Sequence, residues 1–148
     1  MFLATGAGAG YAPIAPGTAG SLVGLALGYF VLAPLWRAYP LGFALCFAIA
    51  FAGGCGVAGA AERILGEHDS SKIVLDEIFG MVAAMFLNPT GALWVGASFA
   101  IFRFFDILKP FPANYFDRRV GGGAGVMLDD LAAGIYANLV LQAARRLL

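Results

Sequence analysis

Charged residues are scarce in this sequence, and the few that occur are unevenly distributed. They make up 12% of the 148 residues, whereas soluble domains carry about 25%. Hydrophobic residues make up 61%, and the mean hydropathy is +0.84. Between residues 22 and 61, Arg37 is the one side chain of the Asp, Glu, Lys, Arg or His type. The composition therefore indicates an integral membrane protein.

Histidine and cysteine are almost as scarce, which excludes several kinds of site. The one histidine, His68, rules out mechanisms that need several imidazoles. Cys46 and Cys55 lie nine residues apart in an apolar segment and form no motif that could hold zinc. The formal net charge is zero, so no basic field predicts binding to nucleic acid.

The apolar segments predict an all-α fold: a compact integral-membrane helical bundle with short or re-entrant helices and a site at one membrane face. The length is typical of a single domain, here over residues 1–148. Residues 5–20 are rich in Gly, Ala and Pro and predict an irregular or loosely helical entry. Helices are expected over Ser21–Trp36, which Ser21 could cap, and over Leu41–Ala61. These two helices would form a hairpin.

The second half of the chain predicts shorter elements. The apolar residues 78–87 are too few to span a bilayer and are separated by Asn-Pro-Thr from the apolar residues 91–105. We expect this pair to form a short hairpin or a re-entrant element buried against other helices. Pro110 predicts that the second of these helices ends near Lys109. The last segment, 131–148, does not distinguish a spanning helix from an interfacial one.

Hairpins return the chain to the side from which it started. The charged or Gly-rich regions near residues 5–21, 62–77 and 103–130 are therefore expected at the same membrane face. A few charged residues that converge in a highly hydrophobic protein indicate a functional site at that face.

Two pairs of adjacent carboxylates are the first candidates for that site. Asp76 and Glu77 precede one apolar segment, and Asp129 and Asp130 precede another. Each pair could simply stabilise a helix N-terminus by capping or through the macrodipole. Adjacent carboxylates also repel each other, and Mg²⁺ favours sites of a few carboxylates with water and phosphate oxygens. We interpret the two pairs as ligands of a shared metal site.

The segment AIFRFFDILKPFP places Arg103, Asp106 and Lys109 among Phe, Ile and Leu. Burying an isolated ion costs several kcal/mol, so these charges need a partner, a metal or a charged substrate. Arginine can bind a phosphate through two N–H groups, and lysine supplies a point charge. Lys72 is a further candidate for the same task. The alternative is an Arg103–Asp106 ion pair, three residues apart on one helix face, that holds the bundle together.

The segment APGTAGSL is a weaker candidate for anion binding. Gly17 and Gly20 allow a close backbone approach, and Thr18 and Ser21 offer hydroxyl groups beside a helix start. No G-K-[ST] follows, so this is not a P-loop of the nucleotide-binding type. A tight helix entry without a ligand is the alternative.

Three segments together resemble the bacterial phosphatidylglycerophosphatase A family. They read LATGAGAGYAPIAPGTAGSL, HDSSKIVLDEIFGM and FRFFDILKPFPANYFDRRVGGGAGVMLDDLAAGIYA. They occur in the order of the family and cover nearly the whole chain. The patterns PGTxGS, DExxG, RxxDxxKPxP and GGxGxMxDDxxAG are highly specific in combination.

This resemblance implies a magnesium-dependent phosphatase that removes the terminal phosphate of phosphatidylglycerophosphate. The expected location is the bacterial inner membrane, with the active site facing the cytoplasm and a phospholipid as the partner. Mg²⁺ would be held by Asp76, Glu77, Asp129 and Asp130, with Asp106 either joining them or orienting Arg103. The phosphate would be bound by Arg103, Lys109 and Lys72, with Thr18 and Ser21 assisting, and Asp69 is a further candidate for a general base.

Two rival functions remain open on the sequence. One is a small transporter or channel subunit, because charges inside the membrane also mark ion pathways. The other is a phosphatase that acts on another phosphorylated lipid. Direct attack by water is favoured over a covalent intermediate, because the sequence has no convincing nucleophile motif. Head-group selectivity, the number of metal ions and the oligomeric state are not predicted.

Overall fold

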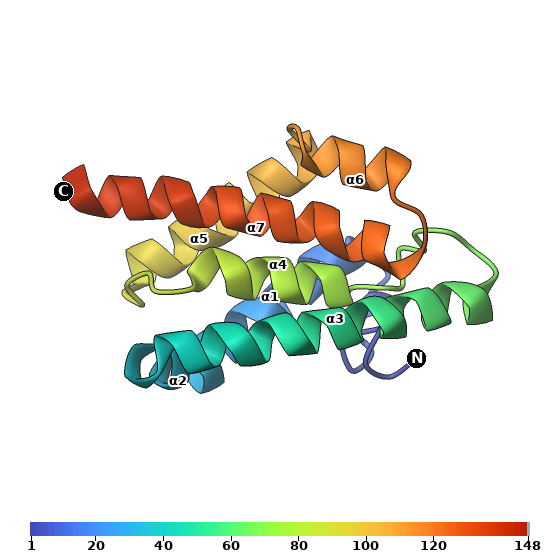
Figure 1. Cartoon of the computed structure of the whole chain (residues 1–148), viewed down its shortest axis with the longest axis horizontal. Helices are drawn as coiled ribbons and strands as arrows, with labels where there is room; N and C mark the ends of the chain where they lie inside the picture. The colour runs from blue at the N-terminus through green and yellow to red at the C-terminus, as the bar shows by residue number, and fades with distance from the viewer. Residues whose placement is uncertain (148) are drawn as a thin grey trace.

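The structure is a computed structural model that describes residues 1–147, except the side chain of residue 117, and that part of the chain is helical without strands (Figure 1). The prediction of an all-α fold is therefore confirmed. In chain order, the elements are η1 (Ala9–Tyr11), α1 (Pro16–Leu27), the π-helical η2 (Gly28–Leu32), α2 (Ala33–Ala38), α3 (Pro40–Leu65), α4 (Leu75–Met85), α5 (Ala92–Leu108), α6 (Ala113–Arg119) and α7 (Gly122–Leu147).

Three helical segments are long and apolar enough to cross a membrane: Pro16–Ala38, Pro40–Leu65 and Gly122–Leu147. A helix of 26 residues, the length of the second and third, measures about 39 Å and exceeds the roughly 30 Å of a hydrocarbon core. Only 11% of the most apolar window of α3 is buried inside the protein. Its outer face carries Leu41, Leu45 and Ile49, which are 67–81% exposed. Such a face needs lipid around it, so the fold is a membrane helical bundle.

Helix α4 lies at the centre of the bundle, between α1 and α7 (Figure 1). Small residues allow these backbones to approach closely, as is common between membrane helices. A Cβ atom on Gly24 of α1 would lie 2.8 Å from the carbonyl oxygen of Ile78. A Cβ atom on Gly134 of α7 would lie 2.2 Å from the carbonyl oxygen of Gly80. The first two turns of α4 are therefore held between two neighbouring helices.

Two of the expected helix starts are wrong. Helix α1 begins at Pro16 and not at Ser21, so residues 16–20 of the expected irregular or loosely helical entry are regular helix. Ser21 is consequently not a cap, and its hydroxyl donates a hydrogen bond to the carbonyl oxygen of Gly17 within the helix, at 2.9 Å. Proline fits the first turn of a helix, because the missing N–H has no partner there in any case. Pro16 could therefore have indicated the helix start in the sequence, but the neighbouring glycines suggested an irregular segment instead.

Helix α7 begins at Gly122, which places the expected helix start within its second and third turns. Asp129 and Asp130 are therefore inside the helix, and the N-capping alternative for this pair is excluded. Glycine is a poor helix former, but here it has a packing role. A Cβ atom on Gly123 would lie 2.1 Å from the carbonyl oxygen of Cys55. At 26 residues, α7 is long enough to span a membrane.

Other expectations are confirmed. Helix α4 has 11 residues, too few to span, and pairs with α5. Helix α5 ends before Lys109, which adopts a left-handed conformation with φ of 43°. The N-terminal ends of α1, α4 and α7 and the C-terminal ends of α3 and α5 lie at one end of the bundle (Figure 1). The three charged or Gly-rich regions meet there, as the hairpin arrangement predicts.

Candidate active site

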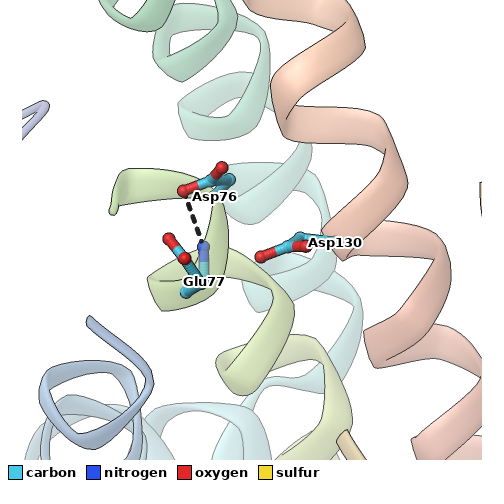
Figure 2. A group of neighbouring side chains, drawn as sticks. All are labelled: Asp76, Glu77 and Asp130. Carbon is cyan, nitrogen blue, oxygen red and sulfur yellow. Dashed lines mark hydrogen bonds between the residues drawn. The ribbon is translucent and has the colours of Figure 1, made fainter. Parts of the chain in front are cut away.

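Three carboxylates from two helices converge at this end of the bundle. Asp76 and Glu77 belong to the first turn of α4, and Asp130 of α7 points toward them (Figure 2). One oxygen from each side chain lies within 4.8 Å of the other two. Asp76 and Asp130 are buried, with 6% and 4% exposure, and Glu77 is half-buried. Among the described residues, Glu77 Oε2 and Asp130 Oδ2 have no hydrogen-bond partner.

Gly80 sets the distance between the two helices that carry these carboxylates. A Cβ atom at this position would lie 2.7 Å from the carbonyl oxygen of Asp130 and 2.6 Å from Cε2 of Phe102. Only glycine allows α7 to approach α4 this closely, one turn after Asp76. The DExxG pattern contained this glycine, but its contact with α7 could not be read from the sequence.

Burial and mutual repulsion make it costly for all three carboxylates to be ionised. Burial raises the pKa of Asp76 well above its usual range, and the charge of Glu77 raises it further. Burial also raises the pKa of Glu77, whereas the nearby Arg103 lowers it. Protons or a cation must therefore compensate the negative charge. Two carboxylate oxygens without hydrogen-bond donors, in a set of hard oxygen ligands, fit a divalent cation such as Mg²⁺.

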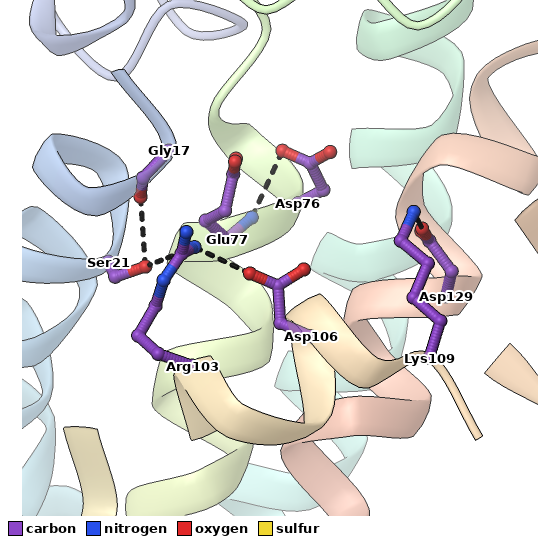
Figure 3. Close-up of polar contacts among 8 residues, drawn as sticks. All are labelled: Gly17, Ser21, Asp76, Glu77, Arg103, Asp106, Lys109 and Asp129. Carbon is purple, nitrogen blue, oxygen red and sulfur yellow. Dashed lines mark hydrogen bonds and ion pairs between the residues drawn. The ribbon is translucent and has the colours of Figure 1, made fainter. Parts of the chain in front are cut away.

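Arg103 of α5 lies beside this cluster and is fixed by two contacts (Figure 3). Its Nη1 is 2.5 Å from Oδ2 of Asp106 and donates a hydrogen bond of 3.3 Å to the hydroxyl of Ser21. The ion-pair alternative is thus present in the structure. A guanidinium has five N–H donors in all, so the ion pair is compatible with binding a further anion.

The first turn of α1 meets the same cluster. A Cβ atom on Gly17 would lie 2.4 Å from Oε1 of Glu77 and 3.5 Å from Nη1 of Arg103. The free N–H groups at the start of α1 are therefore close to both a carboxylate of the cluster and its neighbouring cation. Thr18, the next residue, is half-buried. This arrangement favours the anion-binding interpretation of APGTAGSL over a helix entry without a ligand.

The second predicted acid pair is divided between two environments. Asp129 is buried, and its Oδ2 lies 2.6 Å from Nζ of Lys109 (Figure 3). Asp130, the next residue on α7, faces the three-carboxylate cluster instead. Consecutive residues of a helix point in directions about 100° apart, which explains the separation. Among the described residues, the compact group of metal-ligating side chains is Asp76, Glu77 and Asp130, without Asp129 or Asp106.

Two predicted residues lie in the exposed loop between α3 and α4. Asp69 is exposed, and its backbone N–H donates a hydrogen bond to Oε1 of Glu62 at 3.0 Å. Lys72 is also exposed, and its backbone packs against Gly10. In the part of the chain that the structure describes, neither side chain has an interaction with the cluster. Their roles as base and phosphate ligand stay predictions.

Comparison with known proteins identifies the family to which the chain belongs. The family model described as Phosphatidylglycerophosphatase A matches residues 2–145. A protein of Haemophilus influenzae named Phosphatidylglycerophosphatase A is 43% identical over 141 residues, covering 94% of this chain and 84% of that protein. One of the same name from Escherichia coli is 39% identical, covering 94% and 79% respectively.

A third relative carries a different name. The Putative phosphatidylinositol-3-phosphatase of Bacteroides thetaiotaomicron is 38% identical over 155 residues, covering 98% of this chain and 92% of that protein. No solved structure shows a significant match. A family match over nearly the whole chain, with two relatives of that name, is decisive: the chain belongs to the phosphatidylglycerophosphatase A family.

Proposed function

We propose that this protein hydrolyses the terminal phosphate of phosphatidylglycerophosphate, giving phosphatidylglycerol and phosphate, in a magnesium-dependent reaction. The observation that carries the proposal is the meeting of three carboxylates, Arg103 and the start of α1 at one end of a membrane bundle. Membership of the family and the names of two relatives support the substrate. A lipid phosphomonoester would approach such a site from the surrounding bilayer.

Asp76, Glu77 and Asp130 are the residues that would hold Mg²⁺. Their oxygens are close enough to share one ion, and two of the oxygens lack other partners among the described residues. When bound, the ion would supply Lewis-acid chemistry, offsetting the charge of the phosphate oxygens and increasing the acidity of water. Because the carboxylates lie on two different helices, they would fix its place relative to α4 and α7.

Arg103 and the first turn of α1 would bind the phosphate. Arg103 can donate two parallel N–H groups to phosphate oxygens, and Asp106 and Ser21 hold its guanidinium in place. The N–H groups near Gly17, beside Arg103, would add further donors for the anion. Lys109 is held by Asp129 at 2.6 Å, and its role as a phosphate ligand is part of the proposal.

The reaction needs one P–O bond to form and one to break. A water molecule attacks phosphorus, the bond to the glycerol oxygen breaks, and the leaving oxygen takes up a proton while water loses one. Arg103 would stabilise the negative charge that builds up on the phosphate oxygens. Direct attack by water remains our proposal over a phosphoenzyme.

The protein would face the cytoplasm with the end that carries the site. Cytoplasmic segments of membrane proteins are enriched in Lys and Arg. Six such residues belong to segments at the end with the site, namely Arg63, Lys72, Arg103, Lys109, Arg118 and Arg119, and three belong to the opposite end, namely Arg37, Arg145 and Arg146. This bias supports an inner membrane protein whose site faces the cytoplasm.

A phosphatase for another phosphorylated lipid is the second candidate. The relative named Putative phosphatidylinositol-3-phosphatase favours it, because it is nearly as similar as the other two. The transporter alternative has less support. The described acidic side chains belong to segments at one end of the bundle and do not form a path through it.

Phosphate release by purified protein in detergent distinguishes these functions. We expect faster release from phosphatidylglycerophosphate than from phosphatidylinositol 3-phosphate, and loss of both activities in Asp76→Asn. Glu67→Gln, which removes an exposed acid at the same end, serves as the matched control. Faster release from the inositol lipid would replace the proposed substrate, and release from neither by folded protein would refute a lipid phosphatase.

A further inference from the structure

The end of the bundle opposite the candidate active site, here called the far end, has an unbalanced charge. It is formed by α2, the loop between α4 and α5, and the last turns of α7. It carries Arg37, Arg145 and Arg146, and no acidic side chain among the described residues. Among the described residues, these exposed arginines have no partner of opposite sign, so this end carries a net positive charge.

Two of these arginines flank a pocket of about 330 Å³. Arg37 comes from α2 and Arg145 from α7, two elements far apart in the sequence. The remaining lining residues are Trp36, Leu87, Asn88 and Pro89. The pocket thus lies where three separate segments of the chain meet, with cationic groups from two of them.

The pocket has more hydrogen-bond donors than the protein uses. Arg37 donates to the hydroxyl of Thr90, and Nη1 of Arg145 donates to the carbonyl oxygen of Leu87 at 3.1 Å. Each guanidinium has five N–H groups, and among the described residues these are their hydrogen bonds. Several donors per arginine are therefore left for a ligand.

A buried indole adds a donor without a partner. Trp36 is fully buried, and its Nε1 has no acceptor among the described residues. Buried tryptophan N–H groups usually find one. Oδ1 of Asn88, another residue that lines the pocket, also lacks a partner among the described residues. A phosphate matches a pair of arginines, because its oxygens can accept the forked N–H groups of each guanidinium.

We propose that the far-end pocket binds a phosphate oxyanion, presented by the head group of an anionic phospholipid in the leaflet opposite the candidate active site. The position favours a lipid over a free ion. Three segments of membrane-spanning length end or turn here. Arginine side chains at the membrane surface attract anionic lipids, whose phosphates lie at that level. This inference does not depend on the proposed phosphatase activity.

Lipid retention measured by native mass spectrometry tests the proposal. Protein purified in a neutral detergent is titrated with phosphatidylglycerol or with zwitterionic phosphatidylcholine. We expect the wild type to retain phosphatidylglycerol preferentially, and Arg37→Gln/Arg145→Gln to bind it at least about tenfold more weakly, as expected for lost charge-assisted hydrogen bonds. Arg146→Gln changes an arginine next to Arg145 that is not among the residues lining the pocket; it is the matched control and should stay within about twofold.

A second variant separates lipid binding from a purely structural role of the arginines. Thr90→Val removes the protein partner of Arg37 but keeps the guanidinium. If the proposal is right, Thr90→Val retains the lipid while the double arginine variant does not, at equal thermal stability in detergent or after correction for it. Equal retention of phosphatidylglycerol by the double variant and by Arg146→Gln, or no preference over phosphatidylcholine, would overturn the proposal.

Inorganic phosphate distinguishes the two sources of the anion. For a lipid site, millimolar phosphate should not displace phosphatidylglycerol, because the acyl chains hold the head group at the interface. Displacement by phosphate, together with phosphate binding that disappears in the double variant, would assign the pocket to free phosphate and overturn the lipid assignment.

Discussion

Asp129 and Asp130 show how strongly two adjacent residues can differ. Both are acidic, buried and part of the same helix, and from the sequence they were interpreted together as one pair of metal ligands. The structure places Asp130 in the carboxylate cluster and Asp129 against Lys109. Spacing alone could not divide them, because the sequence did not show that α7 begins at Gly122 and continues through both residues.

The two residues should therefore respond differently to the same substitution. Asp130→Asn removes a proposed metal ligand and should lower kcat/KM by more than about 100-fold. Mutating residues that only hydrogen-bond to metal ligands already lowers metal affinity or activity by about 10–100-fold. This loss should be partly recovered at high Mg²⁺. Asp129→Asn should be insensitive to added Mg²⁺, because it disturbs Lys109 instead. Mg²⁺ titrations of phosphate release test this, and equal Mg²⁺ responses would contradict the division.

The raised pKa of the Asp76 carboxyl leads us to expect that metal binding depends on pH. Its raised pKa means that the metal-free protein holds a proton on this carboxyl at pH values above the ordinary aspartate pKa of about 3.9. Mg²⁺ must displace that proton, so the apparent affinity for Mg²⁺ should increase as the pH rises through the raised pKa. Calorimetry in buffers of different ionisation enthalpy should detect proton release on binding. Binding without proton release would contradict the raised pKa.

At the scale of elements, hydropathy predicted the helices well and their ends poorly. Segments of Leu, Phe, Ala and Val indicated α3 and the α4–α5 pair within a few residues. The starts of α1 and α7 were wrong because glycine and proline suggest loops, whereas here they serve close helix contacts or a helix start. Gly134 touches the backbone of α4, and Gly123 touches that of α3. Such contacts are tertiary and are not visible in a local pattern.

Gly80 offers a direct test of the contact between α4 and α7. Gly80→Ala would place its Cβ 2.6 Å from Phe102 and 2.7 Å from the Asp130 backbone. Overpacking of this kind costs about 1–3 kcal/mol, and Asp130 would be displaced from Asp76.

We expect Gly80→Ala to lower both thermal stability in detergent and activity. Gly96→Ala on α5, where nothing lies within 4 Å of the added methyl group, is the matched control and should be neutral or up to about 1 kcal/mol stabilising. Wild-type stability and activity in Gly80→Ala would show that the two helices are less closely packed.

At the scale of the whole molecule, charge is divided between the two ends of the bundle. The carboxylate cluster and six of the nine Lys and Arg residues belong to segments at one end, and the far end has three arginines and no described acidic side chain. The expectation that helical hairpins return the chain to its starting side was enough to predict that the charged regions meet at one end. It could not predict the far-end pocket, because Arg37 and Arg145 are more than a hundred residues apart.

This division predicts the orientation in the membrane. A cysteine placed at Ser71, in the exposed loop beside the site, should react with an impermeant thiol reagent only after the inner membrane is made permeable. A cysteine in place of Arg146 should react from the periplasmic side without that treatment. Both would be made in a protein lacking Cys46 and Cys55. The reverse labelling pattern would place the site on the periplasmic face.

The central claim is that the cluster of Asp76, Glu77 and Asp130 binds a divalent cation that lipid phosphate hydrolysis requires. The most direct measurement is phosphate release from phosphatidylglycerophosphate by purified protein in detergent, before and after chelation and after Mg²⁺ is restored. We predict release that stops with the chelator and returns with Mg²⁺ in the wild type, but not in Asp130→Asn at the same Mg²⁺ concentration. Unchanged release in excess chelator would contradict the claim.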